Sequence, residues 1–323
     1  MEYVNCDLCG ANDYEVICRK ARFNMDICNV ICKKCGLIYI NPRMDPQESR
    51  EFYKKEYRIL YNQIPEPTKE VIERNLEAGR KILDFASDWV KNAAEILEVG
   101  CATGGLLQVF KNERDGHVFG IEPSLKYSRY AREVFKLNVF TGTIEEFIAK
   151  SEKKGVYDFI ILSHVLEHFS SPSEMLEEIC TFLKENGKIY IEIPNIMNPY
   201  RKLSYFFEVA HLYNFSPVTI QLLLDKTGLQ ILKFDDYASY IMLVAQKTNK
   251  EKTLNYNGEE YKKVLRYLQR YRIYGRQVSL FRQWGRSILL RMLGREQGER
   301  VWEVLKEWRR KRGNKQRHYE NRN

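Results

Sequence analysis

The sequence lacks a long apolar run. None of its segments approaches the ~18 consecutive apolar residues that a membrane-spanning helix requires, so the 323-residue chain is not predicted to cross a bilayer. Residues 1–10 contain neither a basic region nor an apolar stretch, so no secretory signal peptide is expected there. Because disulfides form mainly in secreted proteins, the eight cysteines are expected to remain thiols. These absences predict a cytoplasmic location.

Negative charge is scarce in one part of the chain only. The formal net charge is +9, but residues 250–323 contain 21 Lys and Arg against 8 Glu, which gives this tail +13 and leaves −4 for residues 1–249. Residues 261–312 nevertheless follow a helical pattern, with Leu, Ile and Trp between the arginines. The pattern predicts a basic amphipathic helical extension over 249–323, and not a disordered tail, until about residue 313.

Three interpretations of this extension stay open. An amphipathic helix usually buries its apolar face against protein, here the rest of the chain or a second subunit. Arginines next to Trp and Leu also suit the surface of an anionic membrane, where each basic residue contributes about 1 kcal/mol. Clustered basic residues can bind RNA as well. Peripheral membrane association is therefore one hypothesis that the composition raises.

A strand, a small-residue turn and a helix follow one another around Gly100. The apolar run 96–99 leads to Gly100 and Gly104, which have no Cβ and so permit a tight turn and a close ligand. The helix expected at 105–113 would point its first amides at an anionic ligand group. Glu122 ends a second apolar run, where its carboxylate can accept both hydroxyls of a ribose. This arrangement predicts a site for an adenosine-bearing cofactor.

Two cofactors fit that geometry, a nicotinamide dinucleotide and S-adenosylmethionine. A dinucleotide turn needs Gly-x-Gly-x-x-Gly, whose second glycine makes room for a pyrophosphate, and Ala102 occupies that position. Glu98, at the end of the first strand, can hold an ammonium group directly or through water, but it would repel a pyrophosphate. The residues therefore favour S-adenosylmethionine.

Strand and helix patterns alternate over the following residues. The run 157–162 is almost continuously apolar, as in a strand that helices cover on both faces. Such alternation predicts an α/β fold with a doubly wound, mostly parallel sheet. Helices are expected at 128–137, 143–151, 173–185 and 217–227, and strands at 138–140, 157–162, 188–193, 229–234 and 240–246.

Three groups of residues stand out together: Glu98–Gly104, Glu122-Pro123, and the strand 157–162 with His164–His168 after it. With them, residues 94–248 resemble a class I S-adenosylmethionine-dependent methyltransferase domain. The resemblance implies a seven-stranded Rossmann-like sheet whose last strand is antiparallel. It also implies cofactor contacts from the glycine turn, the ribose-binding acid, the residues around the adenine and the end of the strand 157–162, namely Glu98, Gly100, Ala102, Thr103, Gly104, Glu122, Thr143, Ile144, Ser163 and His164.

The segment His164–His168 also matches the pattern His-x-x-Glu-His. On a helix, that spacing places two imidazoles one turn apart, where they can bind zinc with the glutamate as base. A catalytic zinc needs a third protein ligand, and a methyltransferase already requires these residues at a strand-to-helix turn. The metallopeptidase alternative therefore stands against the hypothesis that His168 faces the substrate.

Two Cys-x-x-Cys pairs lie near the amino terminus. Cys6 and Cys9 are separated from Cys32 and Cys35 by 22 residues, and a glycine that allows a tight turn follows each pair. Four thiolates at this spacing predict a tetrahedral structural zinc in a zinc ribbon. The remaining cysteines are isolated and are expected to be small core residues: Cys18, Cys28, Cys101 and Cys180.

The cysteine pairs and the segments 36–43 and 51–57 resemble a subgroup of these methyltransferases with a zinc ribbon before the catalytic domain. That subgroup includes enzymes that methylate deoxysugars attached to nucleotides, so the resemblance implies a small-molecule or glycan-precursor acceptor. Its carbon-methylating members carry Tyr-x-Glu-His after the fifth strand, and in the stretch 208–211 only His211 matches. O-methyl transfer is therefore favoured, with His211 or His168 as the base for the hydroxyl proton.

The sequence thus predicts four regions: a zinc-ribbon module at 1–45, substrate-side helices at 46–93, the methyltransferase domain at 94–248 and the basic extension at 249–323. The predicted function is methyl transfer from S-adenosylmethionine to a sugar nucleotide or surface-glycan precursor. The alternative is an RNA-binding protein or RNA methyltransferase that uses the ribbon and the tail. Against it, Ser163-His164 replaces the Asn/Asp-Pro-Pro-aromatic motif of amino-directed nucleic-acid methyltransferases, and the ribbon has no evident aromatic platform for bases.

Overall fold

The computed structural model describes residues 1–22, 25–45, 47–48, 51, 66–152, 154–199, 203–236, 239–248 and 254–271. Contacts between residues divide the chain into two compact units, Met1–Leu265 and Arg266–Asn323. Residues 259–271 are helical. The rest of the expected extension, 272–323, lies outside the described residues, and so do residues 52–65 of the expected substrate-side helices. Within the described ranges, no helix is both long and apolar enough to span a bilayer.

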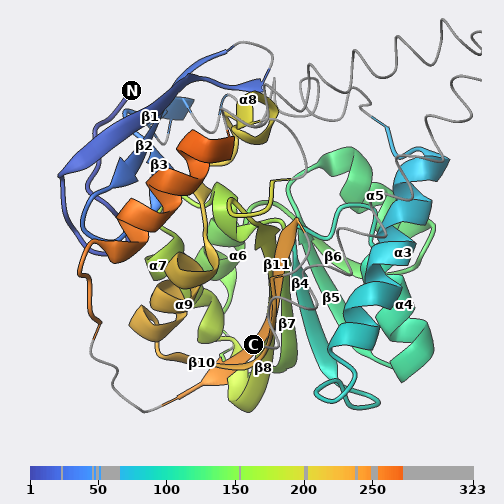
Figure 1. The fold of residues 1–323 in the computed structure, drawn as a ribbon. Helices are drawn as coiled ribbons and strands as arrows, with labels where there is room; N and C mark the ends of the chain where they lie inside the picture. The colour runs from blue at the N-terminus through green and yellow to red at the C-terminus, as the bar shows by residue number, and fades with distance from the viewer. Residues whose placement is uncertain are drawn as a thin grey trace, which may run out of the picture. The chain divides into compact units, whose positions relative to one another are not determined.

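A seven-stranded sheet forms the centre of the first unit (Figure 1). Its spatial order is β10 (Leu229–Asp235), β11 (Tyr240–Lys247), β8 (Leu183–Pro194), β7 (Tyr157–Ser163), β4 (Glu95–Val99), β5 (His117–Glu122) and β6 (Asn138–Thr141). Strands β8, β7, β4, β5 and β6 are parallel, whereas β11 is antiparallel to both of its neighbours. The expected doubly wound sheet with an antiparallel last strand is confirmed.

Helices cover both faces of this sheet (Figure 1). Strand β7 needs cover on both sides because its apolar residues alternate between two cores. Phe159 and Ile161 are fully buried in one core, and Ile160 and Leu162 in the other. One face carries α3 (Lys69–Phe85), α4 (Gly105–Arg114) and α5 (Leu125–Glu133), and the other carries α6 (Ile144–Lys150), α7 (Pro172–Cys180) and α9 (Pro217–Lys226).

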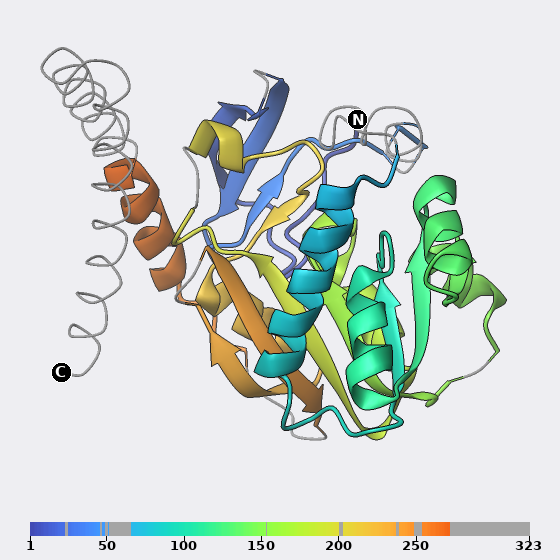
Figure 2. The ribbon, with the colours of Figure 1, turned by 90° about the vertical axis from the view of Figure 1, so that its right-hand side faces the viewer.

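Helices α3 and α4 lie side by side (Figure 2). They approach closely where α4 begins, since a Cβ on Gly105 would stand only 2.9 Å from Asn75 Cβ. This close approach brings Asn75 next to the glycine turn that precedes α4.

A second sheet joins the amino-terminal module to the larger one. Its order is β1 (Tyr14–Lys20), β2 (Asp26–Cys32), β3 (Ile38–Ile40) and β9 (Tyr213–Asn214). Strand β9 comes from the insertion after β8, and Tyr213 pairs with Tyr39 of β3. The rings of these two tyrosines stack with centroids 6.3 Å apart. The cysteine-bearing module therefore belongs to the same compact unit as the large sheet, a connection that the sequence pattern did not predict.

Two expected helices have wrong boundaries. α5 spans Leu125–Glu133 and not 128–137, and the larger difference comes after α7. The helix expected at 173–185 ends earlier, and β8 already begins at Leu183. Leu183 pairs with Tyr157 at the start of β7, and a register shift follows before Lys188 pairs with Phe159. Residues with helical spacing thus extend the sheet, because pairing with a buried strand outweighs local helix propensity.

Asp7, inside the first cysteine pair, holds the amino-terminal module to α7. Its Oδ1 accepts hydrogen bonds from Ser171 Oγ at 3.1 Å and Ser173 Oγ at 3.0 Å, and its Oδ2 accepts the N–H of Ser173 at 3.1 Å. In this fully described helix, Ser171 at the N-cap makes no capping bond with its own side chain. Asp7 therefore caps α7 from a distant part of the chain, with a charge that suits the helix dipole.

Replacing Asp7 by Ala should lower the free energy of unfolding by about 1–2 kcal/mol, because the amide and hydroxyl donors at the start of α7 lose their acceptor. Urea denaturation followed by circular dichroism measures the change. Asp13→Ala is the matched control: its side chain is 69% exposed and pairs with Lys33 on the surface, so its change should stay below about 0.5 kcal/mol. Equal changes in the two variants would contradict the capping role.

Candidate functional site

A glycine turn connects β4 to α4 at the carboxyl edge of the large sheet. Gly100 and Gly104 have φ angles of 76° and 75°, in the left-handed region that glycine adopts at low cost. A side chain on Gly104 would also clash, because a Cβ there would stand 2.6 Å from Leu137 Cδ1. The turn directs the first amides of α4 toward the edge, where they can bind an anionic group.

Glu122 holds this turn from the neighbouring strand. The residue is 3% exposed; its Oε2 accepts the N–H of Ala102 at 3.0 Å, and its Oε1 accepts the N–H of Ser124 at 2.8 Å. Ala102 has a φ angle of 46°, a left-handed conformation that costs a non-glycine residue about 1–2 kcal/mol. The hydrogen bond to Glu122 offsets part of that cost and keeps the carboxylate beside the turn.

Glu98 is buried close to Glu122. It is 5% exposed, and among the described residues its Oε2 has no hydrogen-bond partner. Burial, and then the charge of Glu122, raise the pKa of Glu98 well above its usual range. Such a buried acceptor is costly unless a donor or a cation satisfies it. The pair of carboxylates therefore fits a ligand that brings an ammonium group and hydroxyls, as S-adenosylmethionine does.

Three other predicted cofactor residues have structural contacts of their own. Thr103 is buried, and its Oγ1 accepts a hydrogen bond from Asn75 Nδ2 of α3 at 3.0 Å. Thr143 forms a capping box with Glu146 at the start of α6, and Ile144 is buried in the core. Because these side chains are engaged in the fold, contacts with a cofactor at 143–144 would come from the backbone. The contact of Asn75 with the glycine turn was not predicted from the sequence, because a single amide on a helix forms no motif.

Strand β7 ends in a second turn, which packs on the glycine turn. Ser163 is its last residue, His164 has a φ angle of 55°, and Val165 Cγ2 lies 2.9 Å from the place where Gly100 would carry a Cβ. Only one turn of 3₁₀ helix follows, η2 (Leu166–His168). The His-x-x-Glu-His segment, which is wholly described, is therefore not on an α-helix. The metallopeptidase alternative loses the helical geometry that it requires.

His164 lies between two carboxylates. Its Nδ1 is 3.5 Å from Glu167 Oε1, and its Nε2 is 3.4 Å from Glu192 Oε1. Burial alone would lower the pKa of His164, but the two neighbouring carboxylates outweigh burial and raise the pKa to about 10. The ring is therefore a cation at neutral pH. In that state it offers no lone pair to a metal or to a substrate proton, which leaves an electrostatic role beside the turn.

His168 and His211 meet, although 42 residues lie between them in the chain. Their ring centroids are 5.0 Å apart with an angle of 74° between the planes. The Nδ1 of His168 donates to the carbonyl oxygen of Ala210 at 2.7 Å. Glu167, which is 1% exposed, completes a cluster whose potential ligand atoms all lie within 4.8 Å of one another. The structure thus brings both predicted catalytic histidines together and adds a carboxylate to them.

The amino-terminal module holds the insertion that carries His211. Arg22 Nη1 is 2.9 Å from Glu208 Oε1, and the N–H of Arg22 donates to the carbonyl of Phe207. Glu208 Oε2 in turn lies 3.8 Å from His211 Nε2. Burial, and then the charge of His168, lower the pKa of His211 to about 3, so its ring is neutral. The contribution of Arg22 and Glu208 was missed because nothing in the sequence indicates that two residues so far apart form a pair.

The four cysteines of the two pairs form one cluster. The Sγ atoms of Cys6 and Cys35 are 3.4 Å apart, as are those of Cys9 and Cys32, and all four lie within 4.8 Å of one another. Every cysteine is a free thiol. Sulfur atoms bound to a tetrahedral zinc at about 2.3 Å lie ~3.8 Å apart. The cluster therefore has the donor set and the size of a structural zinc site.

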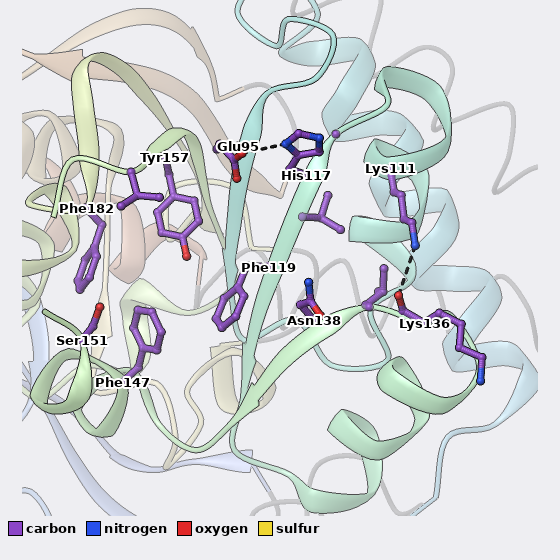
Figure 3. Close-up of a pocket in the computed structure, with 14 residues that line it drawn as sticks. Glu95, Lys111, His117, Phe119, Lys136, Asn138, Phe147, Ser151, Tyr157 and Phe182 are labelled. Carbon is purple, nitrogen blue, oxygen red and sulfur yellow. Dashed lines mark hydrogen bonds and ion pairs between the residues drawn. The ribbon is translucent and has the colours of Figure 1, made fainter. Parts of the chain in front are cut away.

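A separate cavity of about 560 Å³ opens at the opposite, amino-terminal edge of the sheet (Figure 3). Its lining includes Glu95 and His117, the first residues of β4 and β5. The Nδ1 of His117 lies 2.8 Å from the Oε1 of Glu95. Ligands of open α/β sheets bind outside the carboxyl ends of the strands, so this cavity is not the cofactor site. Lys111 and Lys136 lie on one side of it, and the rings on the other side are Phe119, Phe147, Tyr157 and Phe182.

Comparison with known proteins places these features in context. The profile of a family described as "Methyltransferase domain" matches residues 71–233, which are 163 of the 323 residues. The chain is 26% identical over 141 residues to a ubiquinone biosynthesis O-methyltransferase of Aeromonas salmonicida and 27% identical over 167 residues to the protein of the same name in Marinobacter nauticus. These alignments cover 40% and 50% of this chain, and 58% and 63% of the two relatives. The chain thus spans about three fifths of the length of the curated relatives that it matches.

Among solved structures, the chain is similar to the 1,6-didemethyltoxoflavin-N1-methyltransferase of Burkholderia thailandensis, whose crystal structure contains S-adenosylhomocysteine. The two chains are 14% identical with a TM-score of 0.49, and the match covers 66% of this chain and 96% of the other.

Proposed function

Because the chain belongs to the methyltransferase-domain family, we propose that it transfers a methyl group from S-adenosylmethionine to a hydroxyl oxygen of a small-molecule acceptor. The observation that carries this proposal is the pair of buried carboxylates at the glycine turn. Glu122 is held by the backbone of the turn, and Glu98 has a buried oxygen for which the described residues supply no hydrogen-bond donor. Two carboxylates would repel a pyrophosphate, whereas they complement an ammonium group and a ribose.

Each part of the cofactor has a counterpart in this proposal. The turn Gly100–Gly104 lies along the methionine part, and the first amides of α4 face its carboxylate. Glu98 accepts from the ammonium group, and Glu122 accepts from the ribose hydroxyls. The backbone of 143–144 flanks the adenine, while Ser163 and His164 border the cofactor at the end of β7. When bound, S-adenosylmethionine supplies a methyl group that its sulfonium has already activated.

As acceptor we propose a sugar nucleotide or another surface-glycan precursor. This choice rests on the resemblance of the cysteine-bearing module to the ribbon of sugar-nucleotide methyltransferases. Transfer to oxygen is supported by the names of the two curated relatives, which are O-methyltransferases. The stretch 208–211 also supports transfer to oxygen. Of the Tyr-x-Glu-His cluster of carbon-methylating enzymes, it contains only the histidine, His211.

The protein then has two tasks, alignment and proton removal. Glu122 fixes the turn on the cofactor side, and Arg22, through Glu208, fixes the insertion on the acceptor side. Alignment of this kind supplies several orders of magnitude in rate. The hydroxyl proton passes to His168 in the cluster with His211, because the lowered pKa of His211 makes that ring a weak base. A positioned base adds roughly 10²–10⁴-fold in rate.

Replacing Glu122 by Gln should weaken the binding of S-adenosylmethionine by about 10–100-fold. The two ribose hydroxyls would then donate to a neutral amide and no longer to a charged carboxylate, so both hydrogen bonds would lose much of their strength. Isothermal titration calorimetry with the cofactor and with its demethylated product measures this loss. The matched control is Glu95→Gln on β4, because Glu95 lies at the opposite edge of the sheet and lines the other cavity. Unchanged binding in Glu122→Gln, with the native circular dichroism spectrum, would refute the role of Glu122. A wild-type chain that binds neither ligand would refute the proposed function.

We also propose that the cysteine cluster holds one structural zinc ion. The purified protein should then contain about one zinc per chain by mass spectrometry, and Cys32→Ser should lose it together with much of the stability of the ribbon. Cys18→Ser is the control, since Cys18 lies outside the cluster and its thiol donates to the carbonyl of Lys20. A wild-type protein that folds without metal and takes up none would contradict the proposal.

The basic extension is proposed to attach the protein to anionic membrane surfaces, in which case the acceptor is a lipid-linked glycan precursor. The support is the charge of +13 on residues 250–323. The full chain should therefore float with vesicles that contain anionic lipid. With purely zwitterionic vesicles it should remain in the bottom fraction. A chain truncated after Tyr271, which keeps the described part of the extension, should lose flotation. Flotation that survives this truncation would refute the role of the extension.

A further inference from the structure

We propose that Glu167, His168 and His211 bind a divalent transition-metal cation on the acceptor side of the cofactor site. They offer one carboxylate oxygen and two imidazole nitrogens, all within 4.8 Å of one another. Two imidazoles and one carboxylate are a donor set that binds zinc and ferrous iron in enzymes, with positions left open for a substrate. The use of this cation in methyl transfer rests on the proposed function, whereas its binding can be tested separately.

The carboxylate of Glu167 gives the first argument. The residue is 1% exposed, and within the described part of the chain neither of its oxygens has a hydrogen-bond partner. Its ionic contact with His164 is long, 3.5 Å from Glu167 Oε1 to His164 Nδ1. Buried carboxylates in proteins are paired, hydrogen-bonded or bound to a metal, because an unsatisfied one is costly. A cation between Glu167 and the two neighbouring imidazoles would satisfy it.

The outer contacts of the two imidazoles give the second argument. His168 donates its Nδ1–H to the carbonyl of Ala210 at 2.7 Å, so Nε2 is the atom that it can offer to a cation. His211 has Nε2 3.8 Å from Glu208 Oε2, while its buried Nδ1 meets no hydrogen-bond partner among the described residues. Glu208 is itself held by Arg22 at 2.9 Å. Metal-binding histidines have such carbonyl and carboxylate partners, which set the tautomer and the direction of the ring.

The position of the cluster gives the third argument. η2, which carries Glu167 and His168, follows the turn whose Val165 packs on Gly100. The cation would therefore lie near the methyl donor. Ligand atoms around a cation at about 2.1 Å are roughly 3.0–3.5 Å apart, so the three atoms would draw together by ~1–2 Å. The two Cys-x-x-Cys pairs form a separate cluster whose thiolates favour softer ions, so they can be filled with zinc before the nitrogen and oxygen site is tested.

The chemical consequence concerns the acceptor hydroxyl. A hydroxyl oxygen in an open coordination position becomes more acidic, because the cation stabilises the alkoxide. Its O–H bond breaks and the proton passes to solvent; the oxygen electron pair then forms the new O–C bond while the S–C bond of the donor breaks. With the cation in place, His168 and His211 would act as ligands, and the cation would make the hydroxyl acidic enough to lose its proton to solvent. An acceptor with two adjacent oxygens, such as a vicinal diol of a sugar, could bind through both.

The test titrates Co²⁺ into protein whose cysteine cluster already holds zinc, which thiolates bind more tightly than cobalt. The wild-type chain should bind one equivalent of Co²⁺ and develop ligand-field bands without a sulfur-to-cobalt charge-transfer band. Glu167→Gln, His168→Gln and His211→Gln should each weaken this binding by about 100-fold or more, and Glu208→Gln, an outer contact, by about 10-fold. The matched control is His117→Gln at the opposite edge of the sheet, which should bind like the wild type.

Calorimetry with S-adenosylmethionine on every variant separates this inference from the proposed function. Absence of cobalt binding in a wild-type chain that binds the cofactor overturns the metal site and leaves methyl transfer in place. Cobalt binding that persists in at least two ligand variants with intact cofactor binding overturns it as well. Cobalt binding that requires the three residues, in a chain without affinity for S-adenosylmethionine, supports the metal site and overturns the proposed function.

Discussion

The carboxylate of Glu122 makes the contact on which the cofactor edge depends. By accepting the N–H groups of Ala102 and Ser124, it ties the turn after β4 to the end of β5. This contact offsets part of the cost of the left-handed backbone at Ala102. It also places a second negative charge near Glu98, whose pKa rises through burial and through that charge. The proposed preference of the site for a cationic ligand rests on this packing of two carboxylates.

Contacts of three kinds stand out among those that join the amino-terminal module to the rest of the first unit. β3 pairs with β9, Asp7 caps α7, and Arg22 pairs with Glu208. Two of these partners belong to the insertion that ends with His211 and β9. A metal in the cysteine cluster would therefore stabilise the acceptor side of the site, although it lies outside it. The module therefore packs against the insertion that carries His211.

The histidines near the turn differ because their surroundings differ. His164 is flanked by Glu167 and Glu192 and is positively charged, whereas burial and the neighbouring His168 keep His211 neutral. Three imidazoles within one region thus lie in different electrostatic surroundings. Spacing alone grouped His164 with His168 as a zinc pair, and the left-handed backbone at His164 shows why that grouping is wrong.

The sequence by itself determined the features that depend on neighbours in the chain. Apolar periodicity predicted the strands and most helices, and the distance from Gly100 to Glu122 predicted a carboxylate beside the glycine turn, because a β-α-β unit brings successive strand ends to one edge. The two Cys-x-x-Cys pairs predicted a four-sulfur cluster for a similar reason, since each pair closes its own tight turn. Only the tertiary structure decided the start of β8, the pairing of β9 with the ribbon, the link from Arg22 to His211, and the meeting of Glu167 with both imidazoles. Those contacts join residues far apart in sequence, and burial and long-range pairing, which no local pattern encodes, select them.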